Sequence, residues 1–143
     1  ANPDLTVWQI SGDGDCLAIG GNHFIHSVRR NVDINVVLMN NKIYGLTKGQ
    51  YSPTSDRGFV TKSSPYGTVE DPFIPAELVF GARGTFFARS LDVEMSVSQE
   101  VLVEAARHKG TSGRREKIVS PLFLSPLSFS PLYHPLPCPE IKE

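Results

Sequence analysis

The chain has 143 residues, 40% of them hydrophobic, and a formal net charge of −1 at pH 7. This length predicts a single domain at most. The near-zero charge gives no reason to expect nucleic acid or an acidic membrane surface as a partner. No apolar run reaches the roughly 18 residues that span a bilayer, and we expect no signal peptide in the first residues, which have neither a basic region nor an apolar core. Cys16 and Cys138 form no disulfide or metal motif, so we expect a protein of the reducing cytoplasm.

The first 40 residues predict a βαβ unit. Residues 6–11 are rich in β-branched and aromatic side chains and end at a glycine turn, which is typical of a strand. A helix is expected from about residue 18 to 31, with Arg29 and Arg30 in its last turn, where the helix dipole favours cations. Residues 34–39 are almost continuously hydrophobic, as in a strand covered on both faces. Such a unit implies parallel strands and a right-handed crossover.

A long polar segment follows, from Gln50 to about Asp71, and loops of this length inside compact domains are usually functional. Beyond it we expect a helix over 75–81, a strand over 85–89 and a last helix over 96–109. Ser96 and Gln99 have the spacing of a capping box at the start of that helix. Gly110 is suited to ending it.

Residues 111–143 differ in composition from everything before them. Three pentads begin with Ser-Pro-Leu, and six of the 11 prolines fall in this last quarter of the chain. Proline every five residues prevents a helix and disfavours a central strand. We therefore expect one domain over residues 1–110 and a disordered or loosely extended tail over 111–143, with a polyproline-type ligand as the minor alternative.

The chemistry of the chain is concentrated where the first two strands end. Gly12-Asp13-Gly14-Asp15 closes the first strand, and Asn41 follows the second strand 28 residues after Asp13. Carboxyl ends of parallel strands share one edge of a sheet, where α/β proteins bind their ligands. Asp13 offers a charged oxygen, Asn41 an amide oxygen and Ile43 a backbone carbonyl, and Mg²⁺ prefers oxygen ligands. The spacing predicts a magnesium ion that holds a diphosphate, as in thiamine diphosphate enzymes.

Each part of this pattern also has an ordinary structural interpretation. The Gly-Asp-Gly sequence alone is most often a tight turn, and Asn40-Asn41 alone ends a strand. A calcium loop is excluded because its twelfth position would be Phe24 instead of glutamate. His23 and His26 have a metal-ligand spacing, but we interpret them as structural histidines at an interface. Cys16 follows a helix start, where a thiol pKa can fall, although a small buried residue is the favoured interpretation.

Four further segments carry a family resemblance: Gly20–His26, Arg29–Asn31, Ile43–Gln50 and Ser52–Ser55. With the glycine turn, they make the chain similar to the beta subunit of 2-oxoacid:ferredoxin oxidoreductases of the type acting on 2-oxoglutarate. The similarity runs from Ala1 to about Thr111. It implies the α/β fold of thiamine diphosphate-binding domains, a three-layer arrangement with a mostly parallel sheet and helices on both faces, here truncated at both ends.

The resemblance also implies roles for single residues. Magnesium ligands would be Asp13, Asn41 and the Ile43 carbonyl; residues at the diphosphate would be Gly12, Asp13, Gly14, Asp15, Asn41, Gly45 and Thr47; and Leu46 and Lys48 would face the substrate. Lys48 would pair with a carboxylate of the 2-oxo acid, although without the resemblance it would be interpreted as a solvated loop lysine. No side chain is assigned a catalytic role, because in these enzymes the thiamine diphosphate performs the chemistry.

The family reaction is oxidative decarboxylation of a 2-oxo acid to an acyl-CoA, with coenzyme A, an iron–sulfur cluster, ferredoxin and an alpha subunit as partners. The cluster cysteines of the family lie upstream of Ala1 and in a strand after the last helix. We expect that strand to be absent here, replaced from about Ser112 as by a shifted reading frame, and Cys138 is not counted as a ligand. One alternative is a non-catalytic remnant that binds only the cofactor or the alpha subunit. Another is a different thiamine diphosphate-dependent decarboxylase or synthase, which the segment Gly45–Gln50 disfavours.

Overall fold

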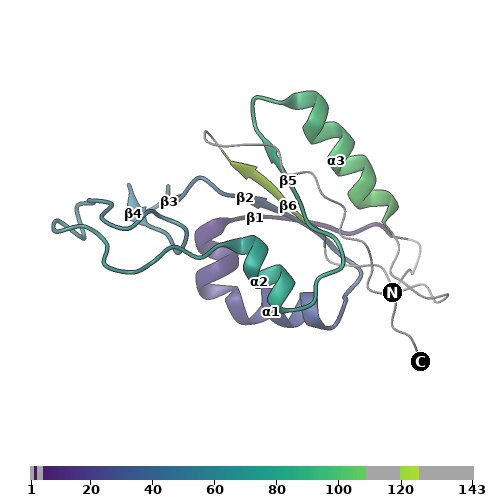
Figure 1. Cartoon of the computed structure of the whole chain (residues 1–143), viewed down its shortest axis with the longest axis horizontal. Coiled ribbons are helices and arrows are strands. Elements are labelled where there is room, and N and C mark those ends of the chain that lie inside the picture. Colours follow the sequence, from purple (N-terminus) through teal and green to yellow (C-terminus); the bar gives the residue numbers. More distant parts are fainter. Residues whose placement is uncertain (1, 3–4, 109–119, 126–143) are drawn as a thin grey trace.

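The computed structural model describes residues 2, 5–108 and 120–125. In this part of the chain the main sheet has four parallel strands, in the order β1 (Trp8–Gly12), β2 (Asn35–Met39), β6 (Ser120–Ser125) and β5 (Ala88–Leu91). Helices α1 (Gly21–Arg29) and α2 (Pro75–Gly81) cover one face, and α3 (Met95–Arg107) covers the other (Figure 1). The predicted three-layer α/β fold with a parallel sheet is confirmed. None of the helices described is long and apolar enough to cross a membrane.

Strand β2 explains why the sheet has two separate cores. Its side chains alternate between faces, so Val36 and Leu38 pack with Phe24 beneath α1 and α2, while Val37 packs with Val101 beneath α3. Leu38 is completely buried and Val36 is 2% exposed. The continuous hydrophobicity of residues 34–39 therefore has the predicted cause, since both faces of the strand are covered.

The first helical region is divided in two, where a single helix was expected. A short π-helix, η1 (Asp15–Ile19), comes directly after the glycine turn, and α1 begins only at Gly21. The Gly20 amide donates across the wider turn to the Asp15 carbonyl at 2.8 Å. A Cβ atom at position 20 would lie 2.7 Å from that oxygen, so the wide turn requires glycine.

The prediction for the end of the chain is wrong at residues 120–125. Strand β6 lies between β2 and β5. In its pairing with β2, Pro121 is opposite Val36 and Leu122 is opposite Val37. Proline lacks an N–H group, but Pro121 is near the start of the strand, where sheets tolerate it. Prolines five residues apart leave four residues free between them, enough for a short strand. A strand after the last helix is thus present, but the expected loss of the family's own strand stays a prediction. The rest of 111–143 lies outside the described residues, and the division at residue 110 stays a prediction.

Several boundaries differ from the expected ones. Strand β5 begins at Ala88, three residues later than expected, and continues to Leu91. Helix α2 has the predicted bounds, with Pro75 in its first turn. Helix α3 begins at Met95 after Glu94, whose side chain makes no capping hydrogen bond, so the capping-box prediction is wrong. A small antiparallel hairpin, β3 (Ile43–Tyr44) and β4 (Gln50–Tyr51), was not expected. It extends from the sheet at the carboxyl ends of β1 and β2 (Figure 1).

Candidate functional site

Asp13 is the central residue of the candidate site. It comes directly after β1, and only 1% of its surface is exposed. The Ser52 hydroxyl donates a hydrogen bond to Asp13 Oδ2, and Thr54 Oγ1 lies 2.5 Å from the same oxygen. A buried carboxylate needs such partners, because removing its charge from water without compensation costs several kcal/mol. The polar loop after β4 therefore folds back over the glycine turn to satisfy Asp13.

The same loop is tied to the end of β2. Thr54 Oγ1 lies 2.7 Å from Asn40 Oδ1, and the Ser55 hydroxyl donates to the Lys42 carbonyl at 2.6 Å. The Ser52 amide in turn donates to Ser55 Oγ at 2.8 Å. We call Asp13, Asn40, Ser52, Thr54 and Ser55 the edge network; all five are buried. It joins the carboxyl ends of two parallel strands, the edge where the sequence placed the site.

Tyr44 covers the glycine turn from the hairpin. Its hydroxyl donates to the Gly14 carbonyl at 3.0 Å, and its ring lies where a Cβ atom of residue 14 would be. Partial burial, and then the charges of Asp13 and Asp15, raise the pKa of the Tyr44 phenol. Nothing in the sequence pattern singles out Tyr44. The one feature that could have pointed to it is its position within residues 43–50, a segment that carries the family resemblance.

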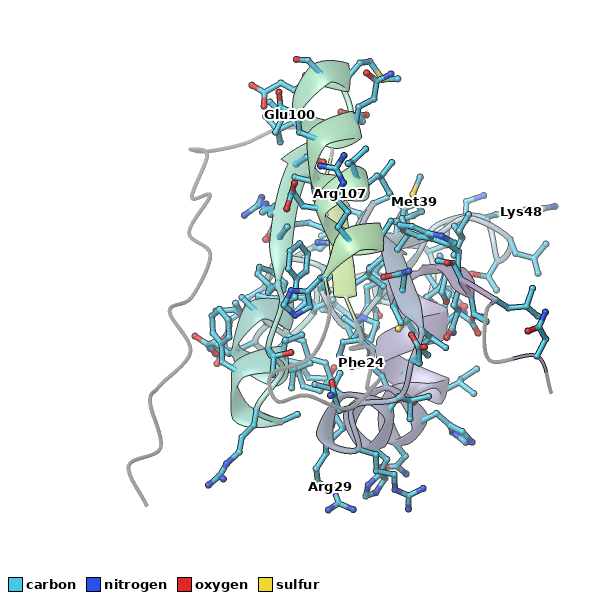
Figure 2. All side chains as sticks on the ribbon, turned by 90° about the vertical axis from the view of Figure 1, so that its right-hand side faces the viewer. Phe24, Arg29, Met39, Lys48, Glu100 and Arg107 are labelled. Atoms are coloured by element: carbon cyan, nitrogen blue, oxygen red, sulfur yellow. The ribbon has the colours of Figure 1, made fainter. Side chains whose placement is uncertain are left out.

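The remaining predicted site residues lie around this network and not within it. Asn41 is exposed, and its Oδ1 accepts a hydrogen bond from the Ile43 amide at 3.3 Å. Asp15 is exposed and accepts from the Ser11 hydroxyl at 2.9 Å. Gly45, Leu46, Thr47 and Lys48 form the exposed turn between β3 and β4. Lys48 has a left-handed backbone with φ 63° and lies at the outer side of the molecule, far from α3 (Figure 2).

A cavity of about 840 Å³ opens beside the edge network. Its lining includes Ser52 of the network, the aromatic side chains Tyr44, Tyr51 and Phe73, and the carboxylates Glu70 and Asp71. A concave region with apolar walls and a few polar groups is the usual form of a small-molecule site. The residues of the glycine turn, Gly12 to Asp15, are not part of its lining, so the cavity adjoins the edge network through Ser52 and Tyr44.

Three residues considered for other chemistry do not form a second site. Cys16 is buried, and burial followed by the charge of Asp15 raises its thiol pKa to about 11. The idea of a lowered thiol pKa is therefore wrong, and the buried interpretation is confirmed. His23 and His26 are exposed on α1, and their role at an interface stays a prediction. Within the described residues, no group of three or more His, Cys, Asp or Glu side chains could hold a metal ion.

The oxygen donors at the sheet edge nevertheless fit magnesium. A carboxylate, an amide oxygen and a backbone carbonyl are hard ligands of the kind that Mg²⁺ selects, completed by phosphate and water. A Cβ atom built on Gly12 would meet no heavy atom within 4 Å, so the backbone is open to a phosphate there. Asp13 and Asn41 follow the adjacent strands β1 and β2, and Ile43 is the first residue of β3. One ion held from both strands suits this arrangement.

Comparison with known proteins agrees with this geometry. Residues 1–112 match the family of thiamine pyrophosphate enzymes through their C-terminal TPP binding domain. The chain belongs to this family. It is 54% identical over 112 residues to the 2-oxoglutarate oxidoreductase subunit KorB of Mycobacterium tuberculosis, covering 78% of this chain and 30% of that protein. It is 46% identical to the 2-oxoglutarate synthase subunit KorB of Archaeoglobus fulgidus, covering 78% of this chain and 42% of that protein.

A solved structure of a 2-oxoglutarate:ferredoxin oxidoreductase from Magnetococcus marinus has the same fold. The TM-score is 0.71 at 35% sequence identity, over 85% of this chain and 40% of that one. The resemblance to 2-oxoacid:ferredoxin oxidoreductases is thereby confirmed. This member of the thiamine pyrophosphate enzyme family spans 30% and 42% of the two KorB proteins.

Proposed function

We propose that this chain provides the magnesium- and diphosphate-binding part of the thiamine diphosphate site in the beta subunit of a 2-oxoacid:ferredoxin oxidoreductase. The observation that carries the proposal is the buried carboxylate of Asp13 at the carboxyl edge of a parallel sheet, in a chain of the TPP-binding family. The substrate we expect is 2-oxoglutarate. Support comes from the KorB relatives, named for 2-oxoglutarate, and from the Magnetococcus structure, which holds 2-oxoglutarate, coenzyme A and succinyl-CoA.

In this proposal Asp13, Asn41 and the Ile43 carbonyl hold the magnesium ion, which neutralises the diphosphate. Gly12 lets the backbone approach the phosphates, and Gly14, beneath the Tyr44 ring, lies beside them with Asp15, Gly45 and Thr47. Leu46 and Lys48 face the substrate, where the ammonium group of Lys48 pairs with a carboxylate of the 2-oxo acid. When bound, thiamine diphosphate supplies the nucleophilic carbon and the electron sink for decarboxylation. The chain's own residues bind and orient it.

The complete reaction requires partners beyond this chain. The proposal includes an alpha subunit, ferredoxin as electron acceptor, coenzyme A as acyl acceptor and a cytoplasmic location. The iron–sulfur cluster of the family is not assigned to the described residues. Cys16, the cysteine among them, is buried with a raised pKa, whereas a cluster ligand must be a thiolate. We therefore derive no electron-transfer step from this chain.

Calorimetric titration of the 143-residue chain with thiamine diphosphate, with and without Mg²⁺, tests the proposal. We expect binding that requires magnesium and is lost in Asp13→Asn, which keeps the size of the side chain but removes its charge. Asp92→Asn is the matched control, because Asp92 is an exposed carboxylate between β5 and α3. Circular dichroism establishes that each variant is folded. Equal binding by Asp13→Asn, or no binding by a folded wild-type chain, would overturn the proposal.

A further inference from the structure

Two hydroxyl groups converge on a single oxygen atom of Asp13. Ser52 and Thr54 both donate to Oδ2, although they lie 39 and 41 residues further along the chain. Asp13, Ser52 and Thr54 are each at most 2% exposed. Neither hydroxyl is directed to the other oxygen, Oδ1. The two hydroxyls therefore hold the carboxylate from the Oδ2 side.

The number of hydroxyl protons determines the direction of each hydrogen bond in this network. Thr54 has one hydroxyl proton but lies within hydrogen-bonding distance of both Asp13 Oδ2 and Asn40, at 2.5 and 2.7 Å. Both contacts are satisfied when the Asn40 amide turns its N–H group to Thr54 Oγ1 and Thr54 donates to Asp13. The result is a directed chain from Asn40 through Thr54 to the carboxylate. Neighbouring bonds in such a chain strengthen one another.

Ser52 is fixed in a similar way. Its amide donates to Ser55 Oγ at 2.8 Å, while the Ser55 hydroxyl proton is used on the Lys42 carbonyl at 2.6 Å. The Ser52 hydroxyl proton is then left for Asp13 Oδ2. Two donors on one oxygen prevent the carboxylate from rotating about its Cβ–Cγ bond. Oδ1 remains the oxygen with unused acceptor capacity.

We propose that Ser52 and Thr54 are positioning residues of the magnesium site, which hold Asp13 by Oδ2 so that Oδ1 serves as the metal ligand. This inference rests on the proposed function, since it concerns the same ion. Hydrogen-bond partners behind a metal ligand typically change metal affinity by about 10–100-fold when they are removed. Merely satisfying a buried carboxylate would instead affect folding stability without a matching change in affinity.

The test compares variants that remove the two hydroxyls with controls that remove equivalent hydroxyls elsewhere. Thr54→Val is matched by Thr68→Val, because Thr68 is also a buried threonine of the long loop, and its hydroxyl donates to the Asp56 carbonyl. Ser52→Ala is matched by Ser98→Ala, because Ser98 is a buried residue of α3 whose hydroxyl donates to Ser90. Thr54→Ser keeps the hydroxyl at the critical position.

The dissociation constant for Mg²⁺ is measured by calorimetry at saturating thiamine diphosphate, and stability is measured by urea unfolding. We expect Ser52→Ala and Thr54→Val to weaken Mg²⁺ binding by about 10–100-fold, while Thr54→Ser and both control variants stay near wild type. If Thr54→Val fails to fold, Ser52→Ala decides the outcome.

The possible outcomes separate the two proposals. Binding that depends on Asp13 but is unchanged in Ser52→Ala would overturn this inference and leave the proposed function standing. An equal loss of affinity in the control variants would also overturn it, because the effect would then be a general one. A folded wild-type chain that binds no Mg²⁺ with thiamine diphosphate would overturn both.

Discussion

The interior beneath α1 and α2 and the edge network are both buried, but different interactions hold them together. The interior is apolar: Leu38 and Val79 have no exposed surface, and Val36 and Phe24 have very little. The edge network is as well buried and consists of one carboxylate, one amide and three hydroxyls. The first region gains from removing apolar surface from water. The second avoids a loss only because each polar group has a partner.

This difference determines how each region tolerates change. Apolar contacts are non-directional, so a smaller side chain in the interior costs free energy in proportion to the lost volume. Hydrogen bonds are directional, so losing one member of the edge network redirects the others. Stability is therefore concentrated in the interior, whereas the geometry that binding requires is concentrated at the edge.

The largest effect on stability is expected from Leu38→Ala, at the centre of the interior. This side chain is completely buried in β2, and such a truncation typically costs about 2–5 kcal/mol. That is a large share of the roughly 5–15 kcal/mol of a whole domain. Urea unfolding followed by circular dichroism measures the loss. Met39→Ala is the control, because the adjacent Met39 is 44% exposed. A similar loss in both variants would show that β2 is not the centre of the core.

The interior was largely predictable from the sequence. The continuous hydrophobicity of residues 34–39 predicted a strand covered on both faces, and β2 is that strand. Helix α2 was predicted at its observed bounds because proline favours a first helical turn. These signals are local, and each is contained in a few consecutive residues. The wrong prediction at β6 also had a local cause. It considered the prolines alone and not the four residues between Pro121 and Pro126, which are able to form a strand.

The edge network was only half predictable. Asp13 was identified because glycines flank it at a strand end, and the fold places it at the expected edge. Asn40, Ser52 and Thr54 were not assigned a role, because a serine or threonine in a polar loop has no sequence pattern that identifies its partner. Their contacts to Asp13 and to each other join residues up to 41 positions apart. Only the folded chain brings such residues together.

Gly14→Ala tests how tightly the edge is packed. Residue 14 has right-handed helical angles, φ −64° and ψ −43°, which alanine adopts without strain. An added Cβ would however lie 2.3 Å from the Tyr44 ring, and overpacking of this kind typically costs about 1–3 kcal/mol. In a Tyr44→Ala background the same substitution should be neutral or stabilising by up to about 1 kcal/mol, as helix propensity predicts. Unfolding of all four proteins in urea gives the coupling free energy.

The outcome that would contradict this packing is additivity. If Gly14→Ala has the same effect with and without the Tyr44 side chain, the ring does not rest on the glycine turn. Gly12→Ala provides a second comparison, because a Cβ atom there would meet no heavy atom within 4 Å. It should lack any coupling to Tyr44.

The smallest effect is expected where the edge is tied to the surface. Lys42 Nζ lies 2.7 Å from Asp56 Oδ1, and the two side chains are 43% and 72% exposed. Exposed ion pairs contribute about 0–1 kcal/mol, and salt screens them. A double-mutant cycle of Lys42→Met and Asp56→Asn should therefore give a coupling below about 1 kcal/mol that shrinks in high salt. A larger coupling that persists in salt would mean that this pair, and not the buried hydroxyls, fixes the loop at the end of β2.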